Sequence, residues 1–404
     1  MSRWLNRNVL AIGLADFAAD ANYEMVLAVL PLFITAGLGA PAITVGLIEG
    51  VADGSSAAIK VWSGWYSDRI AWRKSLAAGG YGATGFGFAL LVAAASWPQV
   101  LVSRAFAWIG RGLRQPIRSA MLAGSVDKGD LGKAFGFHEA MDTAGALVGP
   151  GMAVVLLATH HGFRAIFAVA IIPAVVAVGC FALLTRDPRG GLIPAQPPDF
   201  KLPAQLWRVL IPIGIFGTGN FATAFFTLRS AQMLRPELSV PAATAAAVGF
   251  YLAHNAVGTA VSFPAGWAAD RFGKRTVLAT AYTTFAGACV VGALGHGWLG
   301  VALLALLVGA YEPVVASVEG SLTGSLVEEP KHGTAYGVLN GVNGVGDLAS
   351  SVVAGVLWMA SPTAAMGFGF VLSGAASAIL WTWHGPSSRS SVDQTSASRP
   401  SSTA

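Results

Sequence analysis

About twelve long apolar segments follow one another along this chain, each bounded by charged residues or by Pro/Gly-rich breaks. A helix needs about 20 mostly apolar residues to cross the hydrocarbon core of a bilayer. The segments predict spans at roughly 9–36, 42–67, 74–96, 98–124, 133–157, 163–185, 205–234, 241–267, 275–294, 298–325, 332–358 and 362–384. Only 11% of the residues are charged, whereas soluble domains carry about 25%. The sequence therefore predicts an all-α membrane protein whose outer surface faces lipid.

Lysine and arginine collect in alternate loops between these segments. One set of loops contains Arg3, Arg7, Arg69, Arg73, Lys74, Lys128, Lys133, Arg186, Arg189, Lys201, Arg208, Arg271, Lys274, Arg275 and Lys331. The opposite set contains little beyond Arg164 and Arg235. Basic loops stay on the cytoplasmic side of a membrane, so we expect an integral protein of the cell membrane with both termini in the cytoplasm. The same placement favours membrane topology over nucleic-acid binding as the reason for the net charge of +5.

The chain also repeats itself. Asp68 in GWYSDR corresponds to Asp270 in GWAADR (270 − 68 = 202), and Ala134 in AFG corresponds to Ala335 in AYG (335 − 134 = 201). We therefore expect twelve transmembrane helices in two pseudo-symmetric six-helix bundles, at 1–185 and 205–384. A Pro/Gly-rich cytoplasmic linker at 186–204 and a disordered, Ser-rich cytoplasmic tail at 385–404 complete the prediction. Parallel repeats of this kind bind their substrate between the halves, near the middle of the bilayer.

The two repeated loops resemble the signature of the major facilitator superfamily, G-x-x-x-D-[RK]-x-G-[RK]-[RK]. The copy at 266–275 (GWAADRFGKR) meets every position, whereas the copy at 64–73 (GWYSDRIAWR) departs at Ala71 and Trp72. The resemblance extends over nearly the whole chain and implies the major facilitator fold, with alternating access of a central site. It also implies a cytoplasmic gate, formed here by Gly64, Asp68, Arg69, Arg73, Gly266, Asp270, Arg271, Gly273, Lys274 and Arg275.

A second motif lies in the fifth predicted span. Gly145, Gly149 and Pro150 in GALVGP resemble the motif of the family's proton-coupled antiporter and efflux branch. The glycines give a flat helix face, and the proline removes one intrahelical hydrogen bond. Packing of small residues, which is common in membrane helices, is the alternative interpretation.

Ionisable residues inside the predicted spans are the most informative feature, because each is costly in lipid unless it faces a cavity or a partner. In the first half, we interpret as a proton-coupling network and cavity wall Asp20, Glu24, Glu49, Asp53, Arg111, Arg114, Arg118, Glu139 and Asp142. Asp20 and Asp53 are the first candidates for the proton carrier, with Arg111 and Arg114 as switching partners. A static ion-pair network that only holds helices together is the alternative.

The second half is less charged. Its candidate residues for the substrate cavity are Asn220, His254, Asn255, Glu312, Asn340 and Asn343. At an offset of 201, Glu139 and Asp142 correspond to Asn340 and Asn343. We therefore expect the first half to couple to protons and the second half mainly to shape substrate binding.

Together these features predict a secondary active transporter, most simply a proton-coupled exporter of a small solute. An importer or exchanger of small organic anions, with arginines of the fourth span as a clamp, is the alternative. A non-transporting membrane sensor is a remote third possibility. The chain has no P-loop, zinc spacing or nucleophile elbow, so we expect no enzyme activity, no cofactor and no metal. The expected partners of a monomeric protein are a small-molecule substrate, protons and the lipid bilayer, and no nucleic acid.

Overall fold

The computed structural model describes residues 4–67, 72–126, 131–186, 203–327 and 332–382. Within these ranges the regular secondary structure consists of helices. The first half contains α1 (Arg7–Leu32), η1 (Phe33–Gly37), α2 (Ile43–Ser67), α3 (Arg73–Leu90), η2 (Leu91–Ala93), α4 (Trp97–Ala123), α5 (Leu131–Ala158), α6 (Phe163–Gly179) and η4 (Cys180–Leu184). The short π-helices η1 and η4 and the 3₁₀ turn η2 extend the helices that precede them.

The second half follows the same order. It contains α7 (Ala204–Gly219), α8 (Ala224–Leu234), α9 (Val240–Phe272), α10 (Lys274–Leu294), α11 (Gly297–Ser325), α12 (His332–Ala360) and α13 (Pro362–Thr382). Adding 201 to the bounds of α4 gives 298–324, within one residue of α11, and adding 201 to those of α5 gives 332–359, which matches α12. The repeat found in the sequence is therefore a repeat of whole helices.

The two halves also repeat their helix packing. In the first half α1 packs on α5 and α6, while α4 packs on α2 and α3. In the second half α7 packs on α12 and α13, while α11 packs on α9 and α10. These are equivalent pairs, so the chain forms two pseudo-symmetric six-helix bundles, and the predicted fold class is confirmed.

Eight helices of the described residues are long and apolar enough to cross a membrane, and the bent pair α7–α8 makes a ninth. The long helices α2, α4 and α9 complete the set of twelve. Their apolar runs are interrupted by the charges of α2 and α4 and by His254 and Asn255 of α9. Polar interruptions of this kind mark helices that face an interior rather than lipid.

One predicted span, 205–234, is broken in the structure. Helix α7 ends at Gly219, α8 begins at Ala224, and the two are bent by 40°. Pro212 and the glycines at 214, 217 and 219 weaken the helix just before the break. Backbone polar groups freed at such a break need partners, and here Ser350 of α12 donates to the Asn220 carbonyl (3.0 Å).

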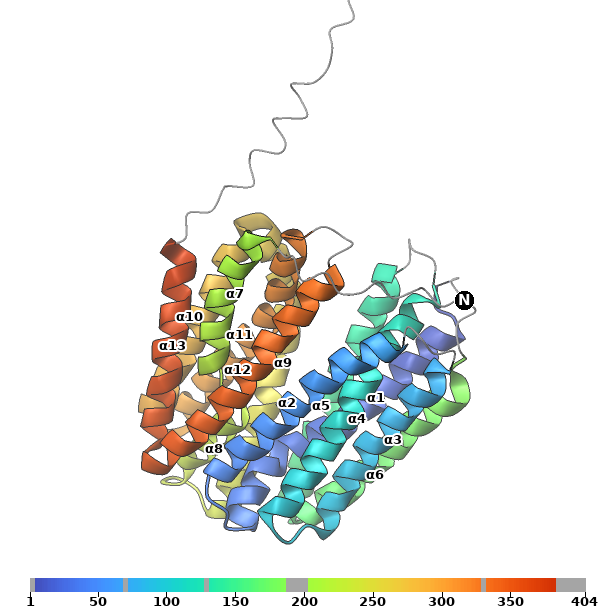
Figure 1. Cartoon of the computed structure of the whole chain (residues 1–404). Helices are drawn as coiled ribbons and strands as arrows, with labels where there is room; N and C mark the ends of the chain where they lie inside the picture. The colour runs from blue at the N-terminus through green and yellow to red at the C-terminus, as the bar shows by residue number, and fades with distance from the viewer. Residues whose placement is uncertain (1–3, 68–71, 127–130, 187–202, 328–331, 383–404) are drawn as a thin grey trace, which may run out of the picture.

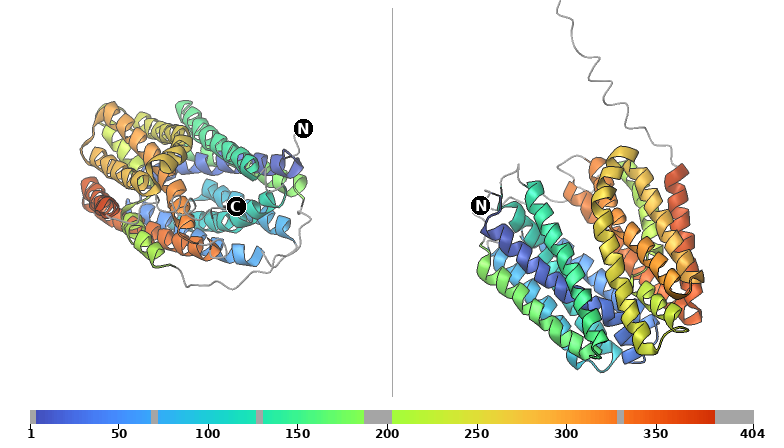
Figure 2. Two further views of the ribbon diagram at one scale, coloured as in Figure 1. Left: turned by 90° about the horizontal axis from the view of Figure 1, so that it is seen from above. Right: turned by 180° about the vertical axis from the view of Figure 1, so that it is seen from behind.

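The bundles contact each other mainly through α2 with α12 and α5 with α9, which are equivalent pairs under the repeat. The ribbons diverge towards the end at which the labelled N-terminus lies, and they come together at the opposite end (Figure 1). Seen from above, the two bundles lie side by side (Figure 2). We call the diverging end the basic end, because Arg7, Arg73, Lys74, Arg208 and Lys274 begin helices there.

Candidate functional site

A cavity of about 440 Å³ lies between the two bundles. From the first half it is lined by Tyr23, Glu24, Leu27, Glu49, Asp53, Arg104, Trp108 and Arg111. From the second half it is lined by Phe216, Gly217, Asn220, Phe221, Ala222, Thr223, Ala224, Tyr251, Tyr311, Glu312, Val315, Ala316, Glu319, Asn343, Asp347 and Ser351. Its size and its mixture of aromatic and polar walls are typical of a small-molecule site.

The break between α7 and α8 forms part of the cavity wall. Residues 220–223 line the cavity, and Tyr311 of α11 donates to the side-chain oxygen of Asn220 (3.1 Å). Irregular backbone at membrane depth is tolerated only where it lines a cavity or is buried in protein. The location of the break therefore agrees with the location of the cavity.

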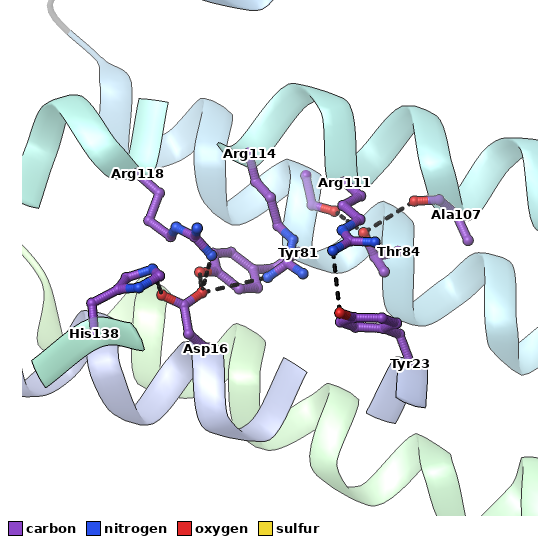
Figure 3. Close-up of polar contacts among 10 residues, drawn as sticks. Asp16, Tyr23, Tyr81, Thr84, Ala107, Arg111, Arg114, Arg118 and His138 are labelled. Atoms are coloured by element: carbon purple, nitrogen blue, oxygen red, sulfur yellow. Dashed lines mark hydrogen bonds and ion pairs between the residues drawn. The ribbon is translucent and has the colours of Figure 1, made fainter. Parts of the chain in front are cut away.

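Beside the cavity, the first half buries an ion cluster centred on Asp16 of α1. Oδ1 of Asp16 accepts hydrogen bonds from Arg118 (2.6 Å) and Tyr81 (2.5 Å), and Nη1 of Arg114 lies 3.7 Å away. His138 of α5 lies 2.9 Å from Oδ2. Figure 3 shows the four side chains converging on this one carboxylate from α3, α4 and α5. Asp16 is fully buried, so the cluster ties four helices together through a single anion.

A second charged pair lies in the cavity wall. Arg104 of α4 bonds Glu49 of α2 at 2.5 Å, and its guanidinium carbon lies 3.2 Å from the centroid of the Trp108 ring. The indole N–H of Trp108 in turn donates to Asp53 (2.7 Å). These contacts satisfy both acids of α2 that face the cavity.

Arg111 lies between the Asp16 cluster and the cavity. It donates to the Tyr23 hydroxyl (3.2 Å), and its guanidinium carbon lies 4.3 Å from the centroid of that ring (Figure 3). It also interacts electrostatically with Asp20, Asp142 and Glu24. A single arginine on the cavity wall is thus surrounded by three acids, only one of which lines the cavity.

Two of these acids, Asp20 of α1 and Asp142 of α5, are neighbours. The two carboxylates interact electrostatically, and Asp20 is 2% exposed. No N–H or O–H group of the described residues donates to Oδ2 of Asp20. Two ionised carboxylates only repel, so two neighbouring carboxyl groups form a hydrogen bond only when one of them carries a proton. Two neighbouring acids of which one is buried form a candidate site for a proton.

Glu24 bridges the two halves. Asn255 of α9 donates to Oε2 of Glu24 (3.2 Å) and to the Ala146 carbonyl (3.3 Å). Tyr251 of α9 lies beside Glu24 in the cavity wall and interacts with it electrostatically. Contacts of this kind hold α1 and α5 against α9, so a change in the charge of Glu24 acts directly on the interface between the bundles.

The second half has a buried carboxylate with neutral partners. Glu319 of α11, 3% exposed, accepts hydrogen bonds from Tyr282 (2.7 Å) and Asn343 (2.8 Å). Each of these residues has an equivalent in the first half: Tyr81 (282 − 81 = 201), Arg118 (319 − 118 = 201) and Asn343 for Asp142 (343 − 142 = 201). A basic residue of α4 is therefore replaced by an acidic residue of α11.

The structure separates the predicted site residues into groups. The cavity is lined by Glu24, Glu49, Asp53, Arg111, Asn220, Glu312 and Asn343. Arg114 and Arg118 face Asp16, and Asp20 and Asp142 face each other. His254 lies 3.8 Å from Glu312, and Asn255 bonds Glu24. Glu139 and Asn340 are exposed, outside the residues that line the cavity.

The predicted gate is only partly within the described residues. Asp68 and Arg69 lie outside them, and the side chains of Gly64, Gly266 and Asp270 are not described. Gly273 has φ = +89°, a conformation that favours glycine and ends α9 immediately before Lys274. Nζ of Lys274 donates to the Ser321 carbonyl (2.9 Å), and Arg271 lies over the rings of Trp267 and Phe272. Gly145 and Gly149 lie against the α1 backbone at Phe17 and Ala21, with Pro150 buried next to them.

Several residues that the structure brings into the site are not among the predicted site residues, although all but Tyr81 are ionisable residues that the predicted spans already contain. Asp16, Tyr81 and His138 form the ion cluster, and Glu319 and Asp347 line the cavity. Asp16 lies four residues before Asp20, on the same face of α1. Glu319 lies 201 residues after Arg118, so a search for pairs of opposite charge at the repeat offset identifies it.

The fold and cavity are those of a membrane transporter built from two repeated bundles. The family model of the Major Facilitator Superfamily matches residues 12–253 and 230–403, and the chain belongs to this family. It is a transporter and not an enzyme. An uncharacterised MFS-type transporter of Methanocaldococcus jannaschii is 27% identical over 383 residues, which cover 92% of this chain and 93% of the relative. An uncharacterised MFS-type transporter of Mycobacterium tuberculosis is 28% identical over 384 residues, which cover 89% and 88% of the two chains.

Solved structures share the fold at low sequence identity. The nucleoside transporter NupG superposes with a TM-score of 0.77 at 12% identity, covering 93% of this chain and all of that one. The peptide transporter POT gives a TM-score of 0.75 at 13% identity, with 92% of each chain covered. The human organic anion transporter MFSD10 gives 0.64 at 15% identity, with 93% and 99% covered. Likeness at this level establishes the fold alone.

Proposed function

We propose that this transporter exports a small solute in exchange for protons, by alternating access of the cavity between its two bundles. The observation that carries the proposal is the burial of Asp20 where α1 packs on α5, next to a second acid, Asp142. A pair of carboxyl groups that shares one proton gains or loses a charge when that proton moves. Such a site responds to a proton gradient, whereas a carboxylate fixed between two arginines does not.

Arg111 connects this pair to the cavity. It interacts with Asp20, Asp142 and Glu24, and it lines the cavity beside Tyr23. When the pair is deprotonated, its second negative charge attracts Arg111 away from the cavity. When the pair binds a proton, Arg111 is freed towards Glu24, whose hydrogen bond from Asn255 joins the two halves. Proton binding and the interface between the bundles are thus coupled through one guanidinium.

The direction of transport is proposed from two further features. The basic end is assigned to the cytoplasm by the positive-inside rule, so the diverging bundles correspond to a state open to the cytoplasm. The glycines of GALVGP pack directly on α1 beside the Asp20 side chain. A motif that resembles that of the family's exporters therefore lies against the proposed proton site, with its close backbone contact fixing the position of Asp20.

The alternative, an importer or exchanger of organic anions, needs arginines that reach the substrate. Of the three arginines of this clamp, Arg111 lines the cavity, whereas Arg114 and Arg118 face Asp16 and do not line it. The variant Arg114→Ala separates the two functions. A substrate clamp predicts lost affinity, whereas a partner of the coupling network predicts retained binding with an altered pH dependence.

The proposal is tested in proteoliposomes with an acidic lumen, in which an exporter inserted with its cytoplasmic side outward takes up solute as protons leave. Uptake is measured for a panel of metabolites and drugs, with a pH-sensitive dye in the lumen to record the accompanying proton flux. We expect Asp20→Asn to remove uphill uptake and solute-dependent proton flux while leaving downhill exchange of solute. Glu237→Gln, an exposed acid in the turn after α8, is the matched control. Uphill uptake that survives in Asp20→Asn would exclude the carboxyl pair as the coupling site.

A further inference from the structure

We propose that the transported solute is a small organic cation, bound against an acidic wall that the second half contributes to the cavity. The inference rests on the proposed function only in taking this cavity as the substrate site. It follows from the distribution of charge around the cavity, from the partners of each charged group and from the aromatic side chains between them.

The cavity has a large excess of acids. Glu24, Glu49, Asp53, Glu312, Glu319 and Asp347 line it, against the two bases Arg104 and Arg111. With every group ionised the formal charge is two minus six, or −4. Lys60 of α2 lies behind the wall and interacts with Asp53 and Asp347, which reduces the excess to three. The negative electrostatic potential of the cavity would repel an anionic substrate. A cationic substrate would be attracted and would lower the net negative charge.

The two walls differ in how their acids are satisfied. In the first half, Glu49 pairs with Arg104, Asp53 accepts from Trp108, and Glu24 accepts from Asn255. In the second half, the described residues that line the cavity include no base. Burial of a carboxylate is costly without a partner of opposite charge or a set of donors. The first half therefore contributes both acids and bases to the described cavity lining, and the second half contributes acids alone.

The three acids of the second half differ in the partners that the described residues give them. Glu319 has only the neutral donors Tyr282 and Asn343. Glu312 has only His254 at 3.8 Å, and half of its side chain (51%) is exposed. Asp347 makes no side-chain hydrogen bond or close ion pair with the described residues, and it interacts electrostatically with Asp53 and Glu319, which repel it, and with Lys60, which attracts it. None of the three has an ammonium or guanidinium group of the described residues within ion-pair distance.

The aromatic residues of the same wall suit such a ligand. Phe216, Phe221, Tyr251 and Tyr311 line the cavity beside the acids. Aromatic faces attract organic cations through the ring quadrupole and also bury the apolar part of the molecule. A volume of about 440 Å³ limits the substrate to a molecule of drug or metabolite size.

The test is an equilibrium binding measurement on the full-length protein in detergent, by isothermal titration calorimetry and thermal shift, with probes matched in shape. Benzyltrimethylammonium is compared with phenylmethanesulfonate, which has the opposite charge, and choline is compared with dimethylbutanol, its uncharged carbon analogue. We expect each cation to bind at least about tenfold more tightly than its partner, the difference of one charge contact. Asp347→Asn should abolish most of this preference, whereas Glu237→Gln, outside the cavity, should keep it.

The inference is overturned if the sulfonate or the alcohol binds as tightly as its cation, or if neither cation binds to folded protein. It is also overturned if Asp347→Asn and Glu312→Gln both fold and keep the full preference. Because binding is measured without a gradient, the outcome is independent of proton coupling. If the protein prefers cations but shows no pH-driven uptake, the proposed proton coupling is wrong and the substrate class stands. If it takes up anions in response to a pH gradient, the substrate class is wrong and the proton coupling stands.

Discussion

The fourth helix of each bundle, α4 in the first and α11 in the second, borders the same cavity with opposite charge. Arg111 and Arg118 of α4 correspond to Glu312 and Glu319 of α11 (312 − 111 = 201 and 319 − 118 = 201). In the first half the arginines interact with acids of α1, whereas in the second half the partners of the glutamates among the described residues are His254, Tyr282 and Asn343. One fold therefore supports a closed ion network in one half and an open acidic wall in the other. The difference indicates that duplication conserved the packing and left the charges free to specialise.

The largest expected difference between the halves is in stability. Asp16→Asn leaves Arg118, Arg114 and His138 around a neutral group, and breaking a buried ion pair in this way costs about 3–5 kcal/mol. Glu319→Gln keeps an acceptor for Tyr282 and should cost less than about 1 kcal/mol. Thermal unfolding of the two variants in the same detergent measures both effects. Equal losses would mean that the first half contains no special ion network.

The next prediction replaces one residue of the first half by its equivalent in the second half. Asp142→Asn copies Asn343, removes one member of the carboxyl pair, and should reduce pH-driven uptake about 100-fold or more, since both rate and coupling depend on that proton. In this variant, the rate of solute uptake should no longer rise as the lumen is made more acidic. Proteoliposome flux at several lumen pH values measures the change.

The reciprocal variant Asn343→Asp places a second carboxylate beside Glu319. We expect it to add a second proton-linked step, seen as a steeper pH dependence of cation binding. If Asn343→Asp leaves the pH dependence unchanged and Asp142→Asn retains pH-driven uptake, the division of roles between the halves is wrong.

A smaller effect concerns the close contact of α1 with α5. A Cβ at Gly149 would lie 2.5 Å from the Ala21 carbonyl oxygen, so Gly149→Ala should destabilise the protein by about 1–3 kcal/mol. The equivalent position in the second half is Ser350 (350 − 149 = 201), which has room for a hydroxyl bonded to Asn220. Gly341→Ala, with no atom within 4 Å, is the control and should be neutral or slightly stabilising. Thermal midpoints that fall equally for both alanines would contradict the packing difference.

The smallest expected difference between equivalent positions is that between the two buried tyrosines. Tyr282→Phe removes one donor from Glu319, which keeps Asn343, and should cost about 0.5–1.5 kcal/mol. Tyr81→Phe removes a donor from the Asp16 cluster and should cost about 1.5–3 kcal/mol, because hydrogen bonds to charged groups are stronger. Thermal unfolding measures both, and a larger loss for Tyr282→Phe would show that Glu319 is the more strongly charged centre.

Much of the architecture follows from the sequence because lipid imposes a simple rule: every spanning segment must satisfy its own backbone and present apolar side chains. The spans, the repeat and the resemblance to the major facilitator superfamily were therefore readable. The break at residues 220–223 was not, since a helix that contains Pro and Gly is interrupted only where neighbours such as Ser350 can satisfy the freed carbonyl.

The candidate site could be predicted only in part from the sequence. Charges within spans showed that an interior exists, and equal spacing placed Asp16, Asp20 and Glu24 on one face of α1. The spacing could not predict which of the three acids contacts Arg118, which lies beside Asp142 and which contacts Asn255. These three outcomes depend on small differences in height and rotation between helices that are far apart in the chain.

The sequence by itself determined a chain of apolar helices, duplicated with an offset near 201, with its ionisable residues concentrated inside the first half. Those properties are local, because hydropathy, spacing and internal repetition are written residue by residue. Only the tertiary structure decided that Arg114 and Arg118 face Asp16, that Asp20 faces Asp142, and that the acids of α11 and α12 remain without a base at the cavity. Pairing is a property of contacts between helices, and the free energy of a buried charge is set by the partner that packing brings to it.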